Sequence, residues 1–149
     1  MLSSKRNPDV FLDTSVIIAA LMSPTGGARL LFHLGEAGAI RLFVGKSVLR
    51  EADEVLRRKA PELLPILAQL LNEAHVEIGE DPSEENIRKA GQLVKYLPDA
   101  RVLAEALQVQ ADWFITHDRE HFLNNPALAD LPFRIGTPGD VIVWLRERL

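Results

Sequence analysis

The sequence predicts an α/β fold, a three-layer α/β/α sandwich with a mostly parallel central sheet. Short apolar runs alternate with helical segments along almost the whole chain, and such alternation favours parallel strands that helices cover on both faces. Of the 149 residues, 47% are hydrophobic and 26% are charged, as in ordinary globular proteins. No repeat, low-complexity run or long linker divides the chain. We therefore expect residues 1–149 to form a single domain.

Strands and helices are expected to alternate up to residue 78. Thr14 and Ser15 favour a helix start after a β-prone run, and Gly38 and Pro61 mark later boundaries. The expected elements are a strand at 10–12, a helix over 16–21, a loop at 23–27, a helix at 28–37, a strand at 40–44, helices at 47–59 and 62–74, and a strand at 76–78.

A capping pattern marks the next helix. Asp81 is expected as the cap, Pro82 as the first helical residue and Glu84 as the third. This helix is expected to run to about Tyr96 and to end before Pro98.

Four further elements complete the predicted fold. They are a helix that Asp99 starts and that runs to about Gln110, a strand at 113–116, a strand at 133–136, and a last helix with Thr137, Pro138 and Asp140 at its start.

The composition excludes several kinds of chemistry. The chain has no cysteine, so disulfides, zinc thiolates and thiol nucleophiles are ruled out. Its net charge of −4 gives no overall attraction to nucleic acid, so RNA binding would need a local basic patch. Asp13 interrupts the first apolar segment, which is too short for a membrane span. We therefore expect no signal peptide, no membrane contact and a cytoplasmic location.

Acidic residues follow the predicted strands at one edge of the sheet. Asp13 closes the first strand, Asp118 lies just after the strand at 113–116, and Asp99 opens the helix that leads into that strand. In open α/β sheets ligands bind beyond the carboxyl ends of the strands. Three separated carboxylates are therefore expected to meet at this edge.

A fourth acid is expected from the helix at 47–59. Glu51 lies at the border of the apolar face of this helix, from which it can lean toward the sheet. Glu54 and Asp53 are the competing residues, and the sequence leaves the choice between Glu51 and Glu54 open.

Each acid also has a purely structural interpretation. Asp13 and Asp99 can serve as helix caps, worth ~1 kcal/mol each, Glu51 can be a solvated helix residue, and Asp118 can form a turn. The coincidence of four acids at one edge favours the functional interpretation. The histidines show no metal-ligand spacing, and His117 and His121 are interpreted as surface turn residues that at most touch phosphate.

The chain resembles the PIN-domain family in five segments that follow in order. These are VFLDTSVIIAAL at 10–21, SVLREADEVLRR at 47–58, LPDARVLAEAL at 97–107, DWFITHDREHF at 112–122 and GTPGDVIVWL at 136–145. The resemblance implies a PIN-like, Rossmann-like sandwich and a ribonuclease dependent on Mg²⁺ or Mn²⁺. It also implies that Asp13, Glu51, Asp99 and Asp118 are the catalytic and metal-binding acids.

Two positions depart from the common family pattern. Ser15 stands where Asn is frequent, and His117 stands where Gly is frequent, whereas Glu120 keeps a frequent acid. No departure removes a carboxylate. Residues expected to position substrate or to support the metal ligands are Thr14, Ser15, Thr116, Glu120, Arg101 and Arg119.

The chemistry of the acids agrees with the resemblance. Mg²⁺ and Mn²⁺ prefer oxygen ligands, and one or two such ions activate water and neutralise charge in phosphodiester hydrolysis. Asp13 and Asp118 are expected to bind metal directly and Asp99 directly or through water. Glu51 is expected to bind a second metal or to orient the water.

Many members of the family are toxins of toxin–antitoxin pairs, so an antitoxin is an expected partner beside RNA. The helix at 62–74 is apolar over more than one face, which suggests a homodimer surface, an antitoxin groove or burial by the neighbouring helix. The alternatives are an RNA-processing nuclease without an antitoxin, a receiver-like phospho-acceptor domain and a non-catalytic binding module.

Overall fold

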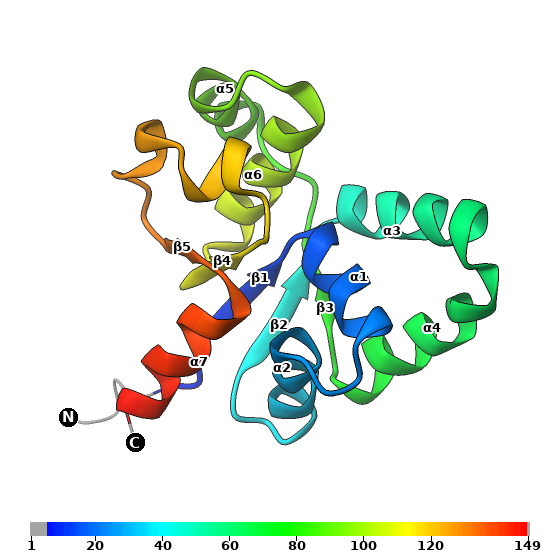
Figure 1. Ribbon diagram of the computed structural model, residues 1–149. Coiled ribbons are helices and arrows are strands. Elements are labelled where there is room, and N and C mark those ends of the chain that lie inside the picture. Colours follow the sequence, from blue (N-terminus) through cyan, green and yellow to red (C-terminus); the bar gives the residue numbers. More distant parts are fainter. Residues whose placement is uncertain (1–5, 149) are drawn as a thin grey trace.

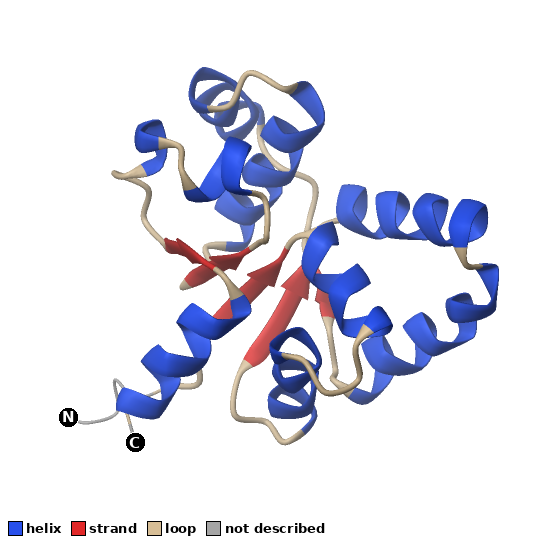
Figure 2. Cartoon of the chain, in the orientation of Figure 1, coloured by secondary structure: helices blue, strands red, loops and turns tan. Residues whose placement is uncertain are grey.

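Five parallel strands form the centre of the fold (Figures 1 and 2), in the order β3-β2-β1-β4-β5. The computed structural model describes residues 6–148 of the chain. The strands are β1 (Asp9–Leu12), β2 (Arg41–Val44), β3 (Glu77–Ile78), β4 (Trp113–Ile115) and β5 (Arg134–Gly136). Every neighbouring pair is parallel, which confirms the predicted fold class.

Helices cover both faces of the sheet. They are α1 (Thr14–Met22), α2 (Gly27–Glu36), α3 (Lys46–Lys59), α4 (Leu64–Glu73), α5 (Glu84–Leu93), α6 (Leu97–Val109) and α7 (Pro138–Glu147), with short helical turns η2 (Pro61–Leu63), η3 (Arg119–Leu123) and η4 (Pro126–Leu128). Figure 1 shows α5 and α6 on one side of the sheet, α1, α2 and α7 on the other, and α3 and α4 folded back on each other beside it.

The strand order reverses between β1 and β4. The chain moves from β1 outward to β2 and β3, and then returns to β4 on the other side of β1. Leu12 pairs with Ile115, so Asp13 and Thr116 follow directly at adjacent strand ends. Such a reversal point is where open α/β sheets bind ligands.

The core is built around β1. Val10, Phe11 and Leu12 are fully buried, because helices cover both faces of this central strand. The ring of Phe114 lies 5.6 Å from that of Phe11 and 4.8 Å from that of Phe122. An uninterrupted apolar run is what a strand buried on both faces requires.

The apolar helix α1 also belongs to the core. Its residues Val16, Ile17 and Ala20 are fully buried. No single helix within residues 6–148 is long and apolar enough to cross a membrane. Only α1 and α2 taken together have the length and hydropathy of a membrane span, and the two helices meet at an angle of 96°.

The predicted cap of α5 is wrong. Ser83, not Asp81, is the N-cap, and its side chain accepts a hydrogen bond from the Asn86 amide. The Ser83 amide in turn donates to Gln108 of α6 over 2.8 Å. This contact between distant segments selects Ser83 over Asp81. The helix also ends at Leu93, three residues before the predicted end.

The predicted boundary at Pro98 is wrong as well. Helix α6 begins at Leu97, so Pro98 lies in its first turn and does not end the preceding helix. Proline is tolerated there because its missing N–H has no partner within the helix anyway. Asp99 therefore lies in the first turn of α6 and is not its cap, a position that Tyr96 takes.

Most of the apolar surface of α4 is covered within the chain. Leu67 and Leu70 are buried, and Leu63, Leu64 and Leu71 pack against the core. Ile66 remains 40% exposed. Burial by neighbouring helices therefore accounts for most of the width of this apolar face.

Candidate metal centre

Asp13 lies at the reversal point of the sheet and is 7% exposed. Its Oδ1 accepts a hydrogen bond from the Thr14 amide (2.8 Å) and its Oδ2 accepts one from the Thr116 hydroxyl (2.7 Å). The Ser15 hydroxyl lies 3.4 Å from Oδ2. Asp13 does occupy the N-cap of α1, as its structural interpretation predicted. The contact with Thr116 adds a link to β4 that helix capping does not require.

Two hydroxyl groups join the turn after β1 to the turn after β4. The Thr116 hydroxyl donates to Asp13 and accepts from the Asp118 amide, over 3.0 Å. The Ser15 hydroxyl accepts from the His117 amide, also over 3.0 Å. These bonds fix Asp118 relative to Asp13.

Asp118 and Asp99 converge on one histidine. The Nδ1 atom of His121 lies 2.9 Å from Asp118 Oδ2 and 3.0 Å from Asp99 Oδ2. Asp118 is the N-cap of η3, where it accepts from the His121 amide, and Asp99 lies in the first turn of α6. Helix N-termini favour negative charge, so the fold supports all three acids at its helix starts.

The pKa values of two acids are raised. Burial is the main cause of the raised pKa of Asp13; the Thr116 and Thr14 hydrogen bonds oppose it, and the charges of Glu51 and Asp118 add to it. Burial also raises the pKa of Asp99, to about 6. The charge of His121 lowers this pKa, whereas the charges of Asp118, Asp13 and Glu51 raise it further. Burial and mutual repulsion make full ionisation of these acids costly.

Glu51 is the acid of α3 whose charge acts on Asp13 and Asp99. It is exposed, and no hydrogen bond or ion pair holds it within residues 6–148. Asp53 accepts from Arg57 over 2.8 Å, and Glu54 is exposed further along the helix. The charge effects on Asp13 and Asp99 therefore favour Glu51 over Glu54 as the fourth acid. Asp13, Glu51, Asp99 and Asp118 are called the acid cluster below.

His121 was not predicted to belong to the site, and its interpretation as a surface turn residue is wrong. Its hydrogen bond to Asp118 raises its pKa above 6.5, and the charges of Asp99, Asp118 and Glu120 add to this effect. Tyr96 stacks on the imidazole with 5.4 Å between ring centroids. The sequence signal is the three-residue spacing from Asp118, which brings the two side chains together once η3 forms.

Glu105 is a second residue that sequence reasoning missed. This carboxylate is 1% exposed and accepts hydrogen bonds from the Ser47 amide and hydroxyl at the start of α3. Gly45, the N-cap of α3, has no side chain to cap the helix, so Glu105 supplies an acceptor from α6. It thereby fixes α3 relative to α6. The sequence feature that points to a special role for Glu105 is the presence of an acid inside the apolar run VLAEAL.

The remaining predicted residues lie outside the acid cluster. Arg101 lies 3.5 Å from Glu105 and 3.8 Å from Asp81, so acids of the chain already engage its guanidinium. Arg119 and Glu120 are exposed on η3. Thr14 is buried, and its hydroxyl has no hydrogen-bond partner among the described residues.

The side chains fit a small divalent cation. Asp99, Asp118 and His121 each offer one ligand atom, and these atoms all lie within 4.8 Å of one another. Mg²⁺ holds its oxygen ligands at about 2.0–2.1 Å, so ligand atoms at this spacing can share one ion after small adjustments. The imidazole lies between the two carboxylates, where a positive charge relieves their repulsion.

Comparisons with known proteins identify the family and the fold of the chain. A family model described as PIN domain matches residues 9–120, a range that includes the whole acid cluster. No curated protein matches the chain in sequence.

Two solved structures share the fold. PAE2754 from Pyrobaculum aerophilum has a TM-score of 0.65 at 15% identity, over 98% of this chain and 96% of its own. A chain of the Rickettsia felis VapBC2 structure, bound to a DNA fragment from its promoter, has a TM-score of 0.61 at 15% identity. That match covers 86% of this chain and 98% of the other.

Proposed function

The chain belongs to the PIN-domain family, and from this membership and its acid cluster we propose that it is an endoribonuclease that requires Mg²⁺ or Mn²⁺. The observation that carries the proposal is the convergence of Asp99 and Asp118 beside the buried Asp13 at the reversal point of the sheet. Membership of this family argues against the alternative that the chain is a receiver-like phospho-acceptor domain.

The acid cluster accounts for the need for a cation. Two carboxylates about 4 Å apart repel by roughly 4 kcal/mol at an effective dielectric constant of ~20. When bound, one or two divalent ions would supply a nucleophilic water and a counter-charge for the phosphate. In this proposal Asp13 and Asp118 hold metal directly, Asp99 directly or through water, and Glu51 holds a second metal or orients the water.

The neighbouring residues keep these carboxylates in position. Thr116 holds one oxygen of Asp13 and the amide of Asp118, while Ser15 holds the amide of His117. The hydroxyl of Thr14 is the unpartnered group that we assign to a bound water. Such supporting contacts orient ligands and tune their basicity.

Two exposed arginines are assigned to RNA. Arg119 lies next to Asp118 and has no acid within ion-pair distance among residues 6–148, so we assign it to phosphate. Arg101 is assigned to phosphate as well, although the carboxylates of Glu105 and Asp81 compete with phosphate for its guanidinium group. Glu120 adds negative charge beside His121.

We further propose that the protein is the toxin of a type II toxin–antitoxin pair and acts in the cytoplasm, with an antitoxin partner and a homodimeric state. The support is the shared fold with the VapBC2 structure. The alternative is an RNA-processing nuclease that has no antitoxin. A short basic DNA-binding protein encoded beside this one would favour the toxin, and growth arrest on expression of the wild type but not of Asp13→Asn would test it.

The test of the activity is cleavage of labelled single-stranded RNA. We expect cleavage with Mn²⁺ or Mg²⁺, none with a chelator, and at least a 100-fold loss (~2.7 kcal/mol) in Asp13→Asn and Asp118→Asn. Asp130→Asn, at an exposed position outside the acid cluster, is the matched control and should cleave normally. Cleavage that survives Asp13→Asn would refute the proposal, and no cleavage by any form would leave a non-catalytic binding module. Single-stranded DNA in place of RNA tests the substrate class.

A further inference from the structure

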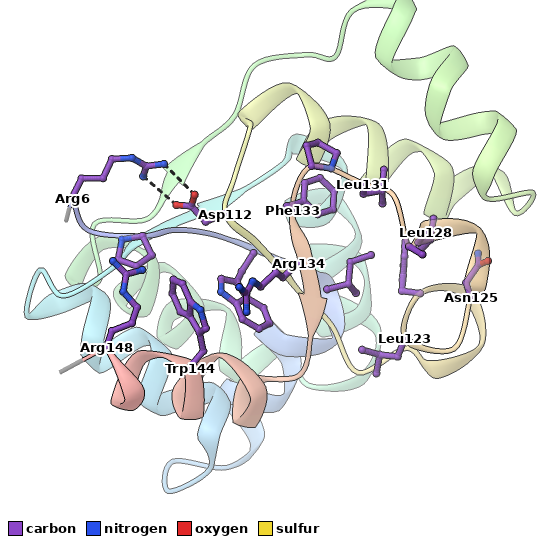
Figure 3. Close-up of a pocket in the computed structure, with 16 residues that line it drawn as sticks. Arg6, Asp112, Leu123, Asn125, Leu128, Leu131, Phe133, Arg134, Trp144 and Arg148 are labelled. Atoms are coloured by element: carbon purple, nitrogen blue, oxygen red, sulfur yellow. Dashed lines mark hydrogen bonds and ion pairs between the residues drawn. The ribbon is translucent and has the colours of Figure 1, made fainter. Parts of the chain in front are cut away.

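A cavity of about 740 Å³ lies at the free edge of β5. Figure 3 shows Arg6, Arg134, Trp144 and Arg148 toward one end of it and Leu123, Asn125 and Leu128 toward the other. Its volume falls in the range of small-molecule binding sites. None of the four acids of the cluster lines it, so it is a separate feature of the molecule.

The cavity carries a local positive charge in a chain whose net charge is −4. Asp112 is the one acid in the lining, and Arg6 pairs with it through two hydrogen bonds of 3.0 and 3.1 Å. Arg134 and Arg148 have no carboxylate within ion-pair distance among residues 6–148. Two guanidinium groups are therefore left to bind an anion.

Tryptophan rings hold both guanidinium groups in place. The Arg148 Cζ lies 4.4 Å from the centre of the Trp144 ring, and the Arg134 Cζ lies 5.6 Å from it. Arg134 also lies 5.8 Å from the ring of Trp113. Stacked arginines lose less conformational freedom on binding, and their planar donors match the oxygens of phosphate.

Trp113 supplies a further unused donor. It is 5% exposed, it lines the cavity, and its Nε1–H has no acceptor among the described residues. Buried indole N–H groups usually find a partner. The apolar side chains of Leu128 and Phe133, also in the lining, provide walls for a flat ring.

From these features we propose that the cavity binds a nucleotide, with its phosphate on Arg134 and Arg148 and its base against the aromatic and apolar walls. A ligand that carries a phosphate on an aromatic ring matches both the two guanidinium groups, which no carboxylate of residues 6–148 engages, and the tryptophan-lined walls. The nucleotide is either free or one unit of an RNA strand. The strand form rests on the proposed ribonuclease function.

The cavity and the acid cluster share two elements. In η3, His121 contacts Asp99 and Asp118, whereas Phe122 and Leu123 line the cavity. In β4, Trp113 lines the cavity and Thr116 follows the strand at the acid cluster. At about 3.3 Å per residue these two positions are about 10 Å apart along the strand. The two sites are therefore neighbours in the fold, and in the strand form of the proposal one RNA strand spans both.

Intrinsic fluorescence tests the proposal directly, because the chain has two tryptophans and both line the cavity. The full chain, kept free of metal by a chelator, is titrated with nucleoside monophosphates and with a short RNA oligonucleotide. We expect saturable quenching in the wild type and about tenfold weaker binding in Arg134→Gln and Arg148→Gln. Arg146→Gln is the matched control, since Arg146 is exposed in the last turn of α7, next to the C-cap residue Arg148, but does not line this cavity.

Each outcome has a distinct meaning. Equal binding of free nucleotide and RNA supports a nucleotide site, and binding of RNA alone supports the strand form. No saturable quenching, or equal weakening in Arg146→Gln, overturns the proposal. Quenching by hexaglutamate but not by nucleotides overturns it in favour of an acidic peptide. Because no cleavage is measured, a failed ribonuclease assay with intact nucleotide binding would refute the proposed function and leave this site standing.

Discussion

The Thr116 hydroxyl donates a 2.7 Å hydrogen bond to Asp13 across 103 positions of the sequence. The contact joins the ends of β1 and β4 at the point where the strand order reverses. It lowers the pKa of Asp13 against the effect of burial. The single hydroxyl therefore connects the architecture of the sheet to the charge of the candidate metal centre.

Replacing Thr116 with valine tests this relationship. Thr116→Val should raise the pKa of Asp13, reduce cleavage and lower the free energy of unfolding by about 1–2 kcal/mol, because a buried carboxylate loses its donor. Thr137→Val is the control, since Thr137 caps α7 and its loss should cost about 1 kcal/mol without affecting cleavage. Equal cleavage by the two variants would contradict the role of Thr116. Chemical denaturation and the RNA assay supply the measurements.

The stability of the metal-free protein should fall as pH rises through 6. Asp99 has a pKa of about 6 in the folded state, against 3.8 for an aspartate fully exposed to water, so the unfolded state loses its proton first and ionisation then penalises the fold. The raised pKa of His121 acts in the same direction, because its stabilising charge is lost at higher pH.

Asp99→Asn isolates this effect. The variant should match the wild type near pH 4 and become the more stable protein above about pH 7, by on the order of 1 kcal/mol after allowance for solvent screening. Thermal melts in a chelator across this pH range measure the difference. A difference that does not change with pH would show that Asp99 ionises normally.

Mn²⁺ should compete with the proton of His121. The Nδ1 atom of His121 lies between the oxygens of Asp99 and Asp118, and these acids raise its pKa, so binding of the cation at these oxygens should release a proton. Affinity measured by calorimetry should therefore rise with pH, and His121→Asn should flatten that dependence. An unchanged pH dependence in the variant would show that the released proton comes from the carboxyl groups and not from His121. His117→Asn, at an exposed neighbour, serves as the control.

Glu51 and Glu54 form a matched pair on α3. The charge of Glu51 acts on Asp13 and Asp99, so Glu51→Gln should lower cleavage at least tenfold, about 1.4 kcal/mol, and reduce repulsion in the metal-free protein. Glu54→Gln should change neither. The reverse order of effects would make Glu54 the fourth acid.

Gly45 should tolerate no side chain. A Cβ at this position would clash with Glu105 Oε1, so Gly45→Ala must displace the carboxylate that holds the start of α3. We expect a loss of about 1–3 kcal/mol, as for other overpacked sites. Gly91→Ala on α5 is the control, since a Cβ there meets nothing within 4 Å and should be neutral or stabilising. Equal melting temperatures for the two variants would contradict this account of Gly45.

The positions of Asp13 and Asp118 could be predicted from the sequence, because each residue comes shortly after an apolar strand that the sequence itself reveals. The parallel sheet then brings adjacent strand ends together. His121 was missed because its role depends on the turn η3, which directs it toward Asp99 of another helix. Glu105 was missed because its partner Ser47 lies on α3, which only the packing of the two helices reveals. The cap at Ser83 likewise depends on Gln108 of a distant segment.

The most direct test of the central claim is an anomalous difference map from crystals grown with Mn²⁺. We expect a peak bounded by carboxylate oxygens of Asp13, Asp99 and Asp118, and its loss in crystals of Asp118→Asn. A peak at other residues, or no peak when Mn²⁺ is saturating, would contradict it.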